Sequence, residues 1–429
     1  MVLVSSPTAA FSWRQGMKAT VIQGGMLALG WEHALYYFVT IASPKGGNEM
    51  AKKSDAYHEL LDTIKAYLEA GQPTLITGPP GTGKTAYIHD LQGTKMQGKD
   101  VHVISMIASN RESTDIGGYP VVVDGVVKFV PVDWAVEARK AHEDGKFVII
   151  FLDEARDISP PVLAALNKAV HERKVGDFEM PKEVRWLAAA NSIDDSTVGV
   201  ALPPPTANRW AHLDWDPSKM VAAWCEGMIA NSFALQTPLS EAAQKRLPAE
   251  RAAIAAFIHH RPELIHSMPK AEDEKDGPWP SPRTLDSTAH VWAAAGNANE
   301  ELRMRLMAGL VGKYTAAENI QWRKSMDLPD PEKVLDGTIT DIVVPNRPDA
   351  TYATVSAVVS CVANKYTHER YIGAWKAFEI LAENGAGDIA AALVPAIENT
   401  TNGKQGVPDI TQYVKALLPI LMRAGVALR

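Results

Sequence analysis

The 429-residue sequence is poor in cysteine, and it has neither a long run of one charge nor an uninterrupted apolar stretch long enough to span a membrane. Its two cysteines, Cys225 and Cys361, are too far apart for a metal-binding motif, so a reducing cytoplasm fits better than a disulfide-stabilised secreted protein. The net charge is -7, and no basic arm indicates nucleic acid, although DNA binding stays open.

Residues 1–49 match neither a signal peptide nor a membrane span. Their most apolar part, residues 24–42, is interrupted by two polar side chains and lacks a cleavage pattern of small residues. The codons for residues 45–47, Lys-Gly-Gly, could form a purine-rich ribosome-binding sequence just upstream of Met50, and translation would then begin at Met50. We therefore expect the extension either to be disordered or to be absent from a native protein that begins at Met50.

The chain is longer than one hydrophobic core usually serves, and its pattern changes twice. Residues 50–216 alternate between strand and helix signals, which predicts an α/β domain with a mostly parallel sheet. Residues 217–330 are alanine-rich and predict helices, and a further helical region, residues 331–429, follows a proline-bearing boundary. In that last region we expect four helices from residue 350 onward, separated by glycines that include Gly385 and Gly387.

The expected elements of the first domain are short and follow one another closely. Strands are predicted over residues 73–77, 101–107, 147–152 and 186–190, helices over 54–70, 84–91 and 159–173, and hairpins over 121–130 and 174–181. The strand at 147–152 is apolar throughout and should lie at the centre of the sheet. Ser159, followed by Pro160, predicts a side-chain cap for its helix. Farther along, helices are expected over residues 220–230, 250–260 and 283–295.

A glycine-rich octapeptide stands between the first strand and the next helix. Its residues are Gly78, Pro79, Pro80, Gly81, Thr82, Gly83, Lys84 and Thr85. This spacing is typical of a P-loop, in which backbone N–H groups wrap a polyphosphate at a helix N-terminus. We expect Lys84 to reach the β- and γ-phosphates of a bound nucleotide and Thr85 to hold Mg²⁺.

Polar side chains follow two of the other predicted strands. Asp153 and Glu154 end the central strand, and the carboxyl ends of strands in an open α/β sheet form the ligand crevice. We expect Asp153 to bind Mg²⁺ through water and Glu154 to polarise the attacking water. Asn191, at the end of its strand, could orient that water. Taken singly, each of these residues could also be a surface or turn residue.

Two arginines are further candidates. Arg209 follows three prolines and precedes Trp210, so it is either an arginine finger or a cation stacked on the indole. Arg283 stands at a predicted helix start, where the helix dipole disfavours positive charge, and a bound phosphate would explain its placement.

Taken in order, these motifs resemble the AAA+ ATPases and, within them, the MoxR-like, dynein-related branch. The resemblance covers about residues 54–295 and includes the P-loop, the strand ending in Leu-Asp-Glu-Ala, Asn191 as sensor 1, Arg209 as finger and Ser-Pro-Arg as sensor 2. The two hairpins resemble inserts that mark this branch. The triple proline at residues 203–205 departs from the family pattern.

The resemblance implies a P-loop NTPase of AAA+ type, with an α/β core, a helical lid over residues 217–330 and a ring assembly, expected to be a hexamer. The residues expected to act within one subunit are Lys84, Thr85, Asp153, Glu154 and Asn191. Arg209 is expected to act on the neighbouring subunit's nucleotide, and Arg283 to report nucleotide state to the lid. ATP and Mg²⁺ are the implied cofactors, and adenine rests on the resemblance alone because a P-loop contacts phosphates.

The implied function is ATP-driven remodelling or maturation of a partner protein, such as one with a von Willebrand factor A domain. Two alternatives stay open: a motor that acts on nucleic acid, as in restriction, phage defence or helicase-like activity, and a nucleotide-gated scaffold with little turnover. The few basic residues in the inserts, Lys128, Lys174 and Lys182, give the motor little support, and Glu154 argues against the scaffold. No membrane partner is expected.

Overall fold

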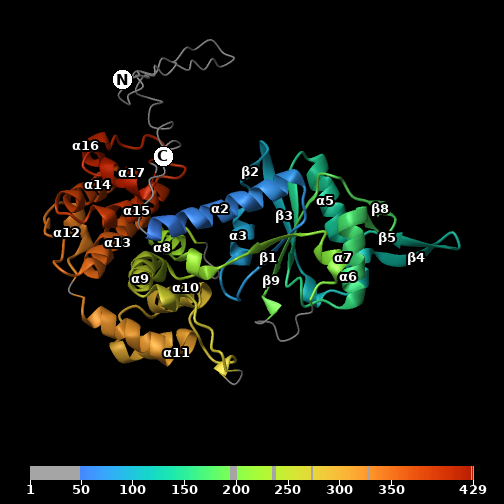
Figure 1. Cartoon of the computed structure of the whole chain (residues 1–429), viewed down its shortest axis with the longest axis horizontal. Coiled ribbons are helices and arrows are strands. Elements are labelled where there is room, and N and C mark those ends of the chain that lie inside the picture. Colours follow the sequence, from blue (N-terminus) through green and yellow to red (C-terminus); the bar gives the residue numbers. More distant parts are fainter. Residues whose placement is uncertain are drawn as a thin grey trace, which may run out of the picture.

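The computed structural model describes residues 49–193, 201–233, 238–271, 274–326, 328–426 and 428. The predicted extension before residue 49 lies outside the described residues. Figure 1 shows an α/β part and a helical part, with α2 (Glu49–Ala70) running between them. The helix predicted over residues 54–70 is thus confirmed and begins earlier.

The α/β part is built on a six-stranded sheet of order β10-β1-β9-β6-β3-β2. The strand bounds are β1 Thr74–Thr77, β2 Lys95–Met96, β3 Lys99–Ile107, β6 Phe147–Asp153, β9 Arg185–Ala190 and β10 Ala211–Asp214. All neighbours are parallel except β2 and β3. The apolar strand β6 lies between β9 and β3, which confirms the predicted central strand.

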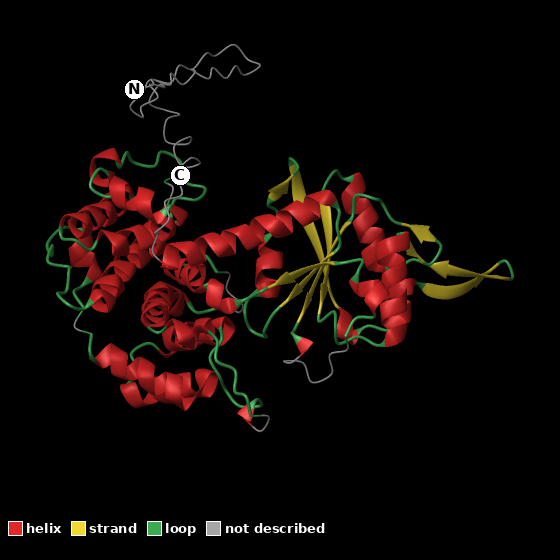
Figure 2. Cartoon of the chain, viewed as in Figure 1, coloured by secondary structure: helices red, strands yellow, loops and turns green. Residues whose placement is uncertain are grey.

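Helices cover both faces of the sheet, as Figure 2 shows. The helices of this part, besides α2, are α3 Lys84–Asp90, α4 Ser113–Gly117, α5 Asp133–Glu143, α6 Pro160–Asn167 and α7 Pro204–Ala207. Successive residues of a strand point to opposite faces. Ile150 therefore packs in one buried cluster with Trp134 of α5, while Ile149 packs in another with Ile64 of α2 and Ile88 of α3.

Two hairpins extend from the α/β part, as predicted. Strands β4 (Tyr119–Val123) and β5 (Val126–Val130) are joined by Asp124 and Gly125, whose φ angles of 52° and 76° suit a tight two-residue turn. The shorter hairpin pairs β7 (Lys174–Val175) with β8 (Phe178–Glu179). Its Asp177 N donates to the Phe129 oxygen at 3.1 Å, so the short hairpin supports the base of the long one, which projects away from the sheet (Figure 1).

The predicted side-chain cap at Ser159 is wrong. Ser159 precedes α6, but its hydroxyl accepts no capping hydrogen bond. Pro160 and Pro161 occupy the first two helical positions, so Pro161 has no N–H to donate to a cap. The helix continues as a π-helical turn, Lys168–Glu172, and ends where Arg173 adopts φ 56°.

The helical part begins with α8 (Val221–Ile229), α9 (Glu241–His260), α10 (Pro282–Ala295) and α11 (Glu300–Lys324). The prediction that the second of these begins at Glu250 is wrong. It begins at Glu241, where the Ser240 hydroxyl accepts from Ala243 N. Pro248 lies inside the helix and interrupts the sequence pattern, although tertiary packing keeps the helix continuous.

The remaining helices are α12 Pro331–Leu335, α13 Pro348–Asn364, α14 His368–Glu383, α15 Gly387–Asn399, α16 Thr411–Val414 and α17 Leu418–Ala424. Four helices were expected from residue 350 onward, whereas the described chain has three long helices there, α13 to α15, and two short ones, α16 and α17. Gly387 begins α15 and does not separate helices. No described helix is both long and apolar enough to cross a lipid bilayer.

One hydrophobic core extends through the helical part. Its buried residues run from Val221 in α8 to Leu421 in α17, so the helices before and after residue 330 pack together. The division into a lid, 217–330, and a C-terminal region, 331–429, remains a prediction.

A buried ion pair ties the first helices of this part together. Arg251 of α9 is 1% exposed and donates to both carboxylate oxygens of Asp286 in α10, at 2.8 and 3.2 Å. It also donates to Asn231 Oδ1, just after α8, at 2.7 Å. Removal of the cation would leave the Asp286 carboxylate buried without its main partner.

We expect Arg251→Met to lower the free energy of unfolding by roughly 3 kcal/mol, because one charge of a buried ion pair is then left without its partner. Lys245→Met is the matched control, because Lys245 is an exposed cation of the same helix, 2.7 Å from Glu241. Its loss should cost about 0.5 kcal/mol or less. Urea unfolding followed by circular dichroism measures both, and equal effects would contradict the assignment.

Candidate nucleotide-binding site

The glycine-rich loop lies between β1 and α3, at the carboxyl edge of the sheet. Gly78 N donates to the Ala190 oxygen at 3.2 Å, which ties the loop to the end of β9. A Cβ at Gly78 would lie 2.3 Å from the Trp215 oxygen, so only glycine fits there. Gly83 caps α3 with φ 93°, and a Cβ there would meet nothing within 4 Å. The loop is therefore packed closely on one side and open on the other.

The structure brings together two of the candidate residues, Lys84 and Asn191. Lys84 is 7% exposed, and its Nζ donates to the carbonyl oxygens of Gly78 and Pro79, both at 2.8 Å. The same Nζ lies 3.4 Å from Asn191 Oδ1. A buried cation at the start of a helix, beside an open glycine loop, suits the phosphates of a nucleotide.

Thr85 and Asp153 also meet at this edge. Thr85 Oγ1 donates to Asp153 Oδ2 at 2.7 Å. One hydroxyl and one carboxylate fit Mg²⁺, which usually completes its shell with phosphate oxygens and water. Among the residues that the structure describes, no group of three or more His, Cys, Asp or Glu side chains could hold a metal ion by itself. The pair therefore fits a magnesium ion that arrives with a nucleotide.

Glu154 is exposed and has φ 55°, and its carboxylate has a partner that the sequence analysis missed. Ser109 Oγ donates a short hydrogen bond to Glu154 Oε2. Ser109 lies in a turn, Ala108–Asn110, that follows β3, and β3 pairs directly with β6. A serine just after a strand is a weak signal until the order of the strands is known.

The segment around Arg283 lies against the outside of the loop. Arg283 N donates to the Gly81 oxygen at 3.0 Å, and a Cβ at Gly81 would lie 2.7 Å from Ser281 Oγ. Ser281 caps α10, because its hydroxyl accepts from Thr284 N at 3.3 Å. The Arg283 side chain is exposed, while its backbone N–H group is hydrogen-bonded to the loop.

Arg209 lies apart from the other candidates. It is exposed and precedes β10, whose register pairs Ala211 with Thr74 and Asp214 with Thr77. Arg209 is therefore near the amino end of this strand pair, whereas the P-loop follows the carboxyl end. Burial and, secondarily, the Arg209 charge lower the pKa of His171. Among the ring contacts of described residues, none places Arg209 over Trp210, so stacking on that indole is not seen.

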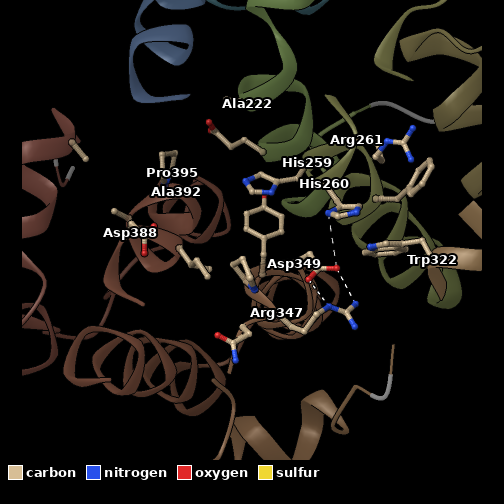
Figure 3. Close-up of a pocket in the computed structure, with 18 of the residues that line it drawn as sticks. Ala222, His259, His260, Arg261, Trp322, Arg347, Asp349, Asp388, Ala392 and Pro395 are labelled. Atoms are coloured by element: carbon tan, nitrogen blue, oxygen red, sulfur yellow. Dashed lines mark hydrogen bonds and ion pairs between the residues drawn. The ribbon is translucent and has the colours of Figure 1, made fainter. Parts of the chain in front are cut away.

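A cavity of about 1080 Å³ lies in the helical part, between α9, α11, α13 and α15 (Figure 3). His259 stacks on Tyr352 in it, with ring centroids 3.6 Å apart, and burial lowers the pKa of His259 to about 4. The Arg347 guanidinium holds the pKa of Asp349 below its usual range. None of the predicted site residues lines this cavity, so it is separate from the P-loop site.

Several solved structures are similar to this chain. NtrX from Brucella abortus is 15% identical with a TM-score of 0.34, over 59% of this chain and 52% of that one, so this chain spans about half of NtrX. RuvB from Thermotoga maritima is 15% identical with a TM-score of 0.32, over 71% of this chain and 82% of that one. A putative ATPase from Cytophaga hutchinsonii is 13% identical with a TM-score of 0.27, over 73% and 80%.

A search of curated proteins found no match. The family model for the AAA domain of the dynein-related subfamily matches residues 73–206, which hold the P-loop, Asp153, Glu154 and Asn191. Residues 73–206 are therefore similar to an AAA domain of the dynein-related subfamily, and they hold the P-loop of the α/β part.

Proposed function

We propose that this protein is a MoxR-like AAA+ ATPase that uses ATP hydrolysis in a ring to remodel a partner protein. The observation that carries the proposal is the meeting of Lys84, Thr85, Asp153 and Asn191 at one edge of the sheet, with 2.7 Å between Thr85 Oγ1 and Asp153 Oδ2. Phosphoryl transfer to water depends on positioning and on charge stabilisation, and these side chains supply both.

Each side chain has a role that follows from its place. The loop amides and Lys84 bind the phosphates, while Thr85 and Asp153 hold Mg²⁺, which supplies positive charge beside the phosphates. Glu154 accepts a hydrogen bond from the attacking water and polarises it, and Asn191 orients the same water. Ser109 Oγ donates to Glu154 Oε2, so this hydrogen bond holds the carboxylate in one orientation, and its release would let the carboxylate turn toward the water.

The position of Arg209 supports a ring. The β1–β10 register separates Arg209 from the P-loop of its own chain by the length of the strand pair. An exposed arginine there can serve as a finger only for a nucleotide held by another subunit. We propose a closed ring, with six subunits expected from the family resemblance.

The β4–β5 hairpin supports a protein client. Val122, Val126 and Val127 are 70%, 59% and 57% exposed, and the hairpin carries only one cation, Lys128. An exposed apolar surface of this kind suits a polypeptide partner, whereas a nucleic-acid surface needs several cations. We propose a client with a von Willebrand factor A domain, and a nucleic-acid motor is the outcome that DNA-stimulated turnover would favour.

Steady-state phosphate release, combined with molar mass by size exclusion and light scattering, tests this mechanism. We expect Glu154→Gln to bind ATP and assemble with turnover at least about 100-fold lower, because the general base is lost. Arg209→Ala should assemble with turnover lowered about 1000-fold. Lys140→Ala, which removes an exposed cation 3.9 Å from Asp144, is the control and should match wild type.

The same assay is run with duplex DNA and with a candidate client that contains a von Willebrand factor A domain. Stimulation by the client alone supports the proposal. A monomer that hydrolyses ATP normally without Arg209 would show that the ring mechanism is wrong.

A second prediction concerns Ser109. Removal of its hydroxyl frees Glu154, and one hydrogen bond to a charged group contributes about 1.5 kcal/mol or more, so Ser109→Ala should raise basal turnover roughly tenfold. Ser109→Thr keeps the hydroxyl and is the control. A fall in turnover in Ser109→Ala would mean that the serine supports the active orientation of Glu154.

A further inference from the structure

Three consecutive carbonyl groups on the outside of the P-loop are each paired with a group from outside the loop. Their pairings are Pro80 O with His266 Nε2 at 3.3 Å, Gly81 O with Arg283 N at 3.0 Å, and Thr82 O with Trp215 Nε1 at 3.1 Å. His266 donates when its Nε2 carries the proton. The outer side of the loop is therefore held along its length.

A held carbonyl fixes the amide of the next residue. The peptide unit is planar and trans, so its C=O and N–H groups point in opposite directions. No cis peptide bond occurs in the described part of the chain. The bond from the Trp215 indole to Thr82 O therefore directs Gly83 N–H away from the indole, toward the open side of the loop. Phosphate recognition by a P-loop depends on amides that point inward.

Trp215 is well placed to hold this peptide. It is 2% exposed, and its ring lies 6.1 Å from that of Tyr57 in α2 and 5.8 Å from that of Tyr87 in α3. Its backbone N donates to the Thr77 oxygen at 2.7 Å, which anchors it to the end of β1. Contacts from two helices and a strand thus restrict rotation of the indole.

Trp215 also marks the point where the chain leaves the α/β part. Asp216 and a short 3-10 turn, Pro217–Lys219, follow it and lead directly into α8. The other two outer partners, His266 and Arg283, belong to the helical part. The orientation of the loop amides is therefore connected with the position of the helical part through hydrogen bonds to the backbone.

We propose that Trp215 is a positioning residue for nucleotide binding, whose indole N–H fixes the Thr82–Gly83 peptide so that the Gly83 amide faces the phosphates. This inference rests on the proposed function, because it requires a nucleotide at the loop. A tryptophan that only fills the core would contribute to stability through its ring, and its N–H would have no specific effect on nucleotide affinity.

The test removes the N–H and keeps an aromatic ring. Trp215→Phe is compared with Trp134→Phe, in which another buried indole of the same α/β part loses its hydrogen bond to the Asp115 oxygen, 3.0 Å long. Calorimetric titration with ADP gives the affinity, and thermal unfolding gives the stability. Loss of one neutral hydrogen bond raises a dissociation constant about three- to tenfold.

We expect Trp215→Phe to bind ADP about three- to tenfold more weakly and Trp134→Phe to bind like wild type, at a similar loss of thermal stability. At saturating ATP, turnover of Trp215→Phe should stay within about twofold of wild type while KM rises. If Trp215→Phe does not fold, replacement of Trp215 by benzothienylalanine removes the N–H and preserves the bicyclic ring.

The outcomes separate this inference from the proposed function. Wild type that binds no ADP would overturn both. Wild type that binds ADP, with Trp215→Phe or the benzothienylalanine variant binding equally well, would overturn the inference alone. Equal weakening in Trp215→Phe and Trp134→Phe would also overturn it, because a general loss of stability would then explain the effect.

Discussion

The parallel pairing of β1, β9 and β6 is the constraint on which the site depends. Its register aligns Thr77 with Ala190 and Leu152 with Ala188, so the residues that follow these strands reach the same edge of the sheet. If β6 ran antiparallel to β1, on the other side of β9, Lys84 and Asp153 would lie at opposite edges. The sheet is buried on both faces, so the strand ends are held rigidly, and a rigid framework suits a reaction governed by positioning.

The P-loop stands between this rigid framework and the helical part. Lys84 lies on its inner side, and on its outer side are hydrogen bonds to Trp215 and to groups of the helical part. A change in the loop would therefore alter contacts with helices that share one core up to α17. Under the proposed function, this arrangement would connect ATP binding and hydrolysis directly with movement of the helical part against the sheet.

Local sequence patterns predicted most of the elements and the inner half of the site. The P-loop, the acidic pair and Asn191 are recognisable because each follows a short apolar strand. The patterns failed where the outcome depends on a neighbour: Pro161 removes one of the two possible donors for the Ser159 cap, and packing carries α9 across Pro248. Ser109, His266 and Trp215 were missed because their partners lie 45, 186 and 133 residues away in sequence and are set by strand order and by the placement of the helices.

Equilibrium binding of ATP, with and without Mg²⁺, to wild type, Lys84→Ala and Thr85→Ala tests the phosphate and magnesium site most directly. We expect wild type to bind ATP more tightly with Mg²⁺, Lys84→Ala to lose most of its affinity, and Thr85→Ala to bind without the gain from Mg²⁺. Affinity that is unchanged in Lys84→Ala, or equal with and without Mg²⁺ in wild type, would contradict a phosphate and magnesium site at this edge of the sheet.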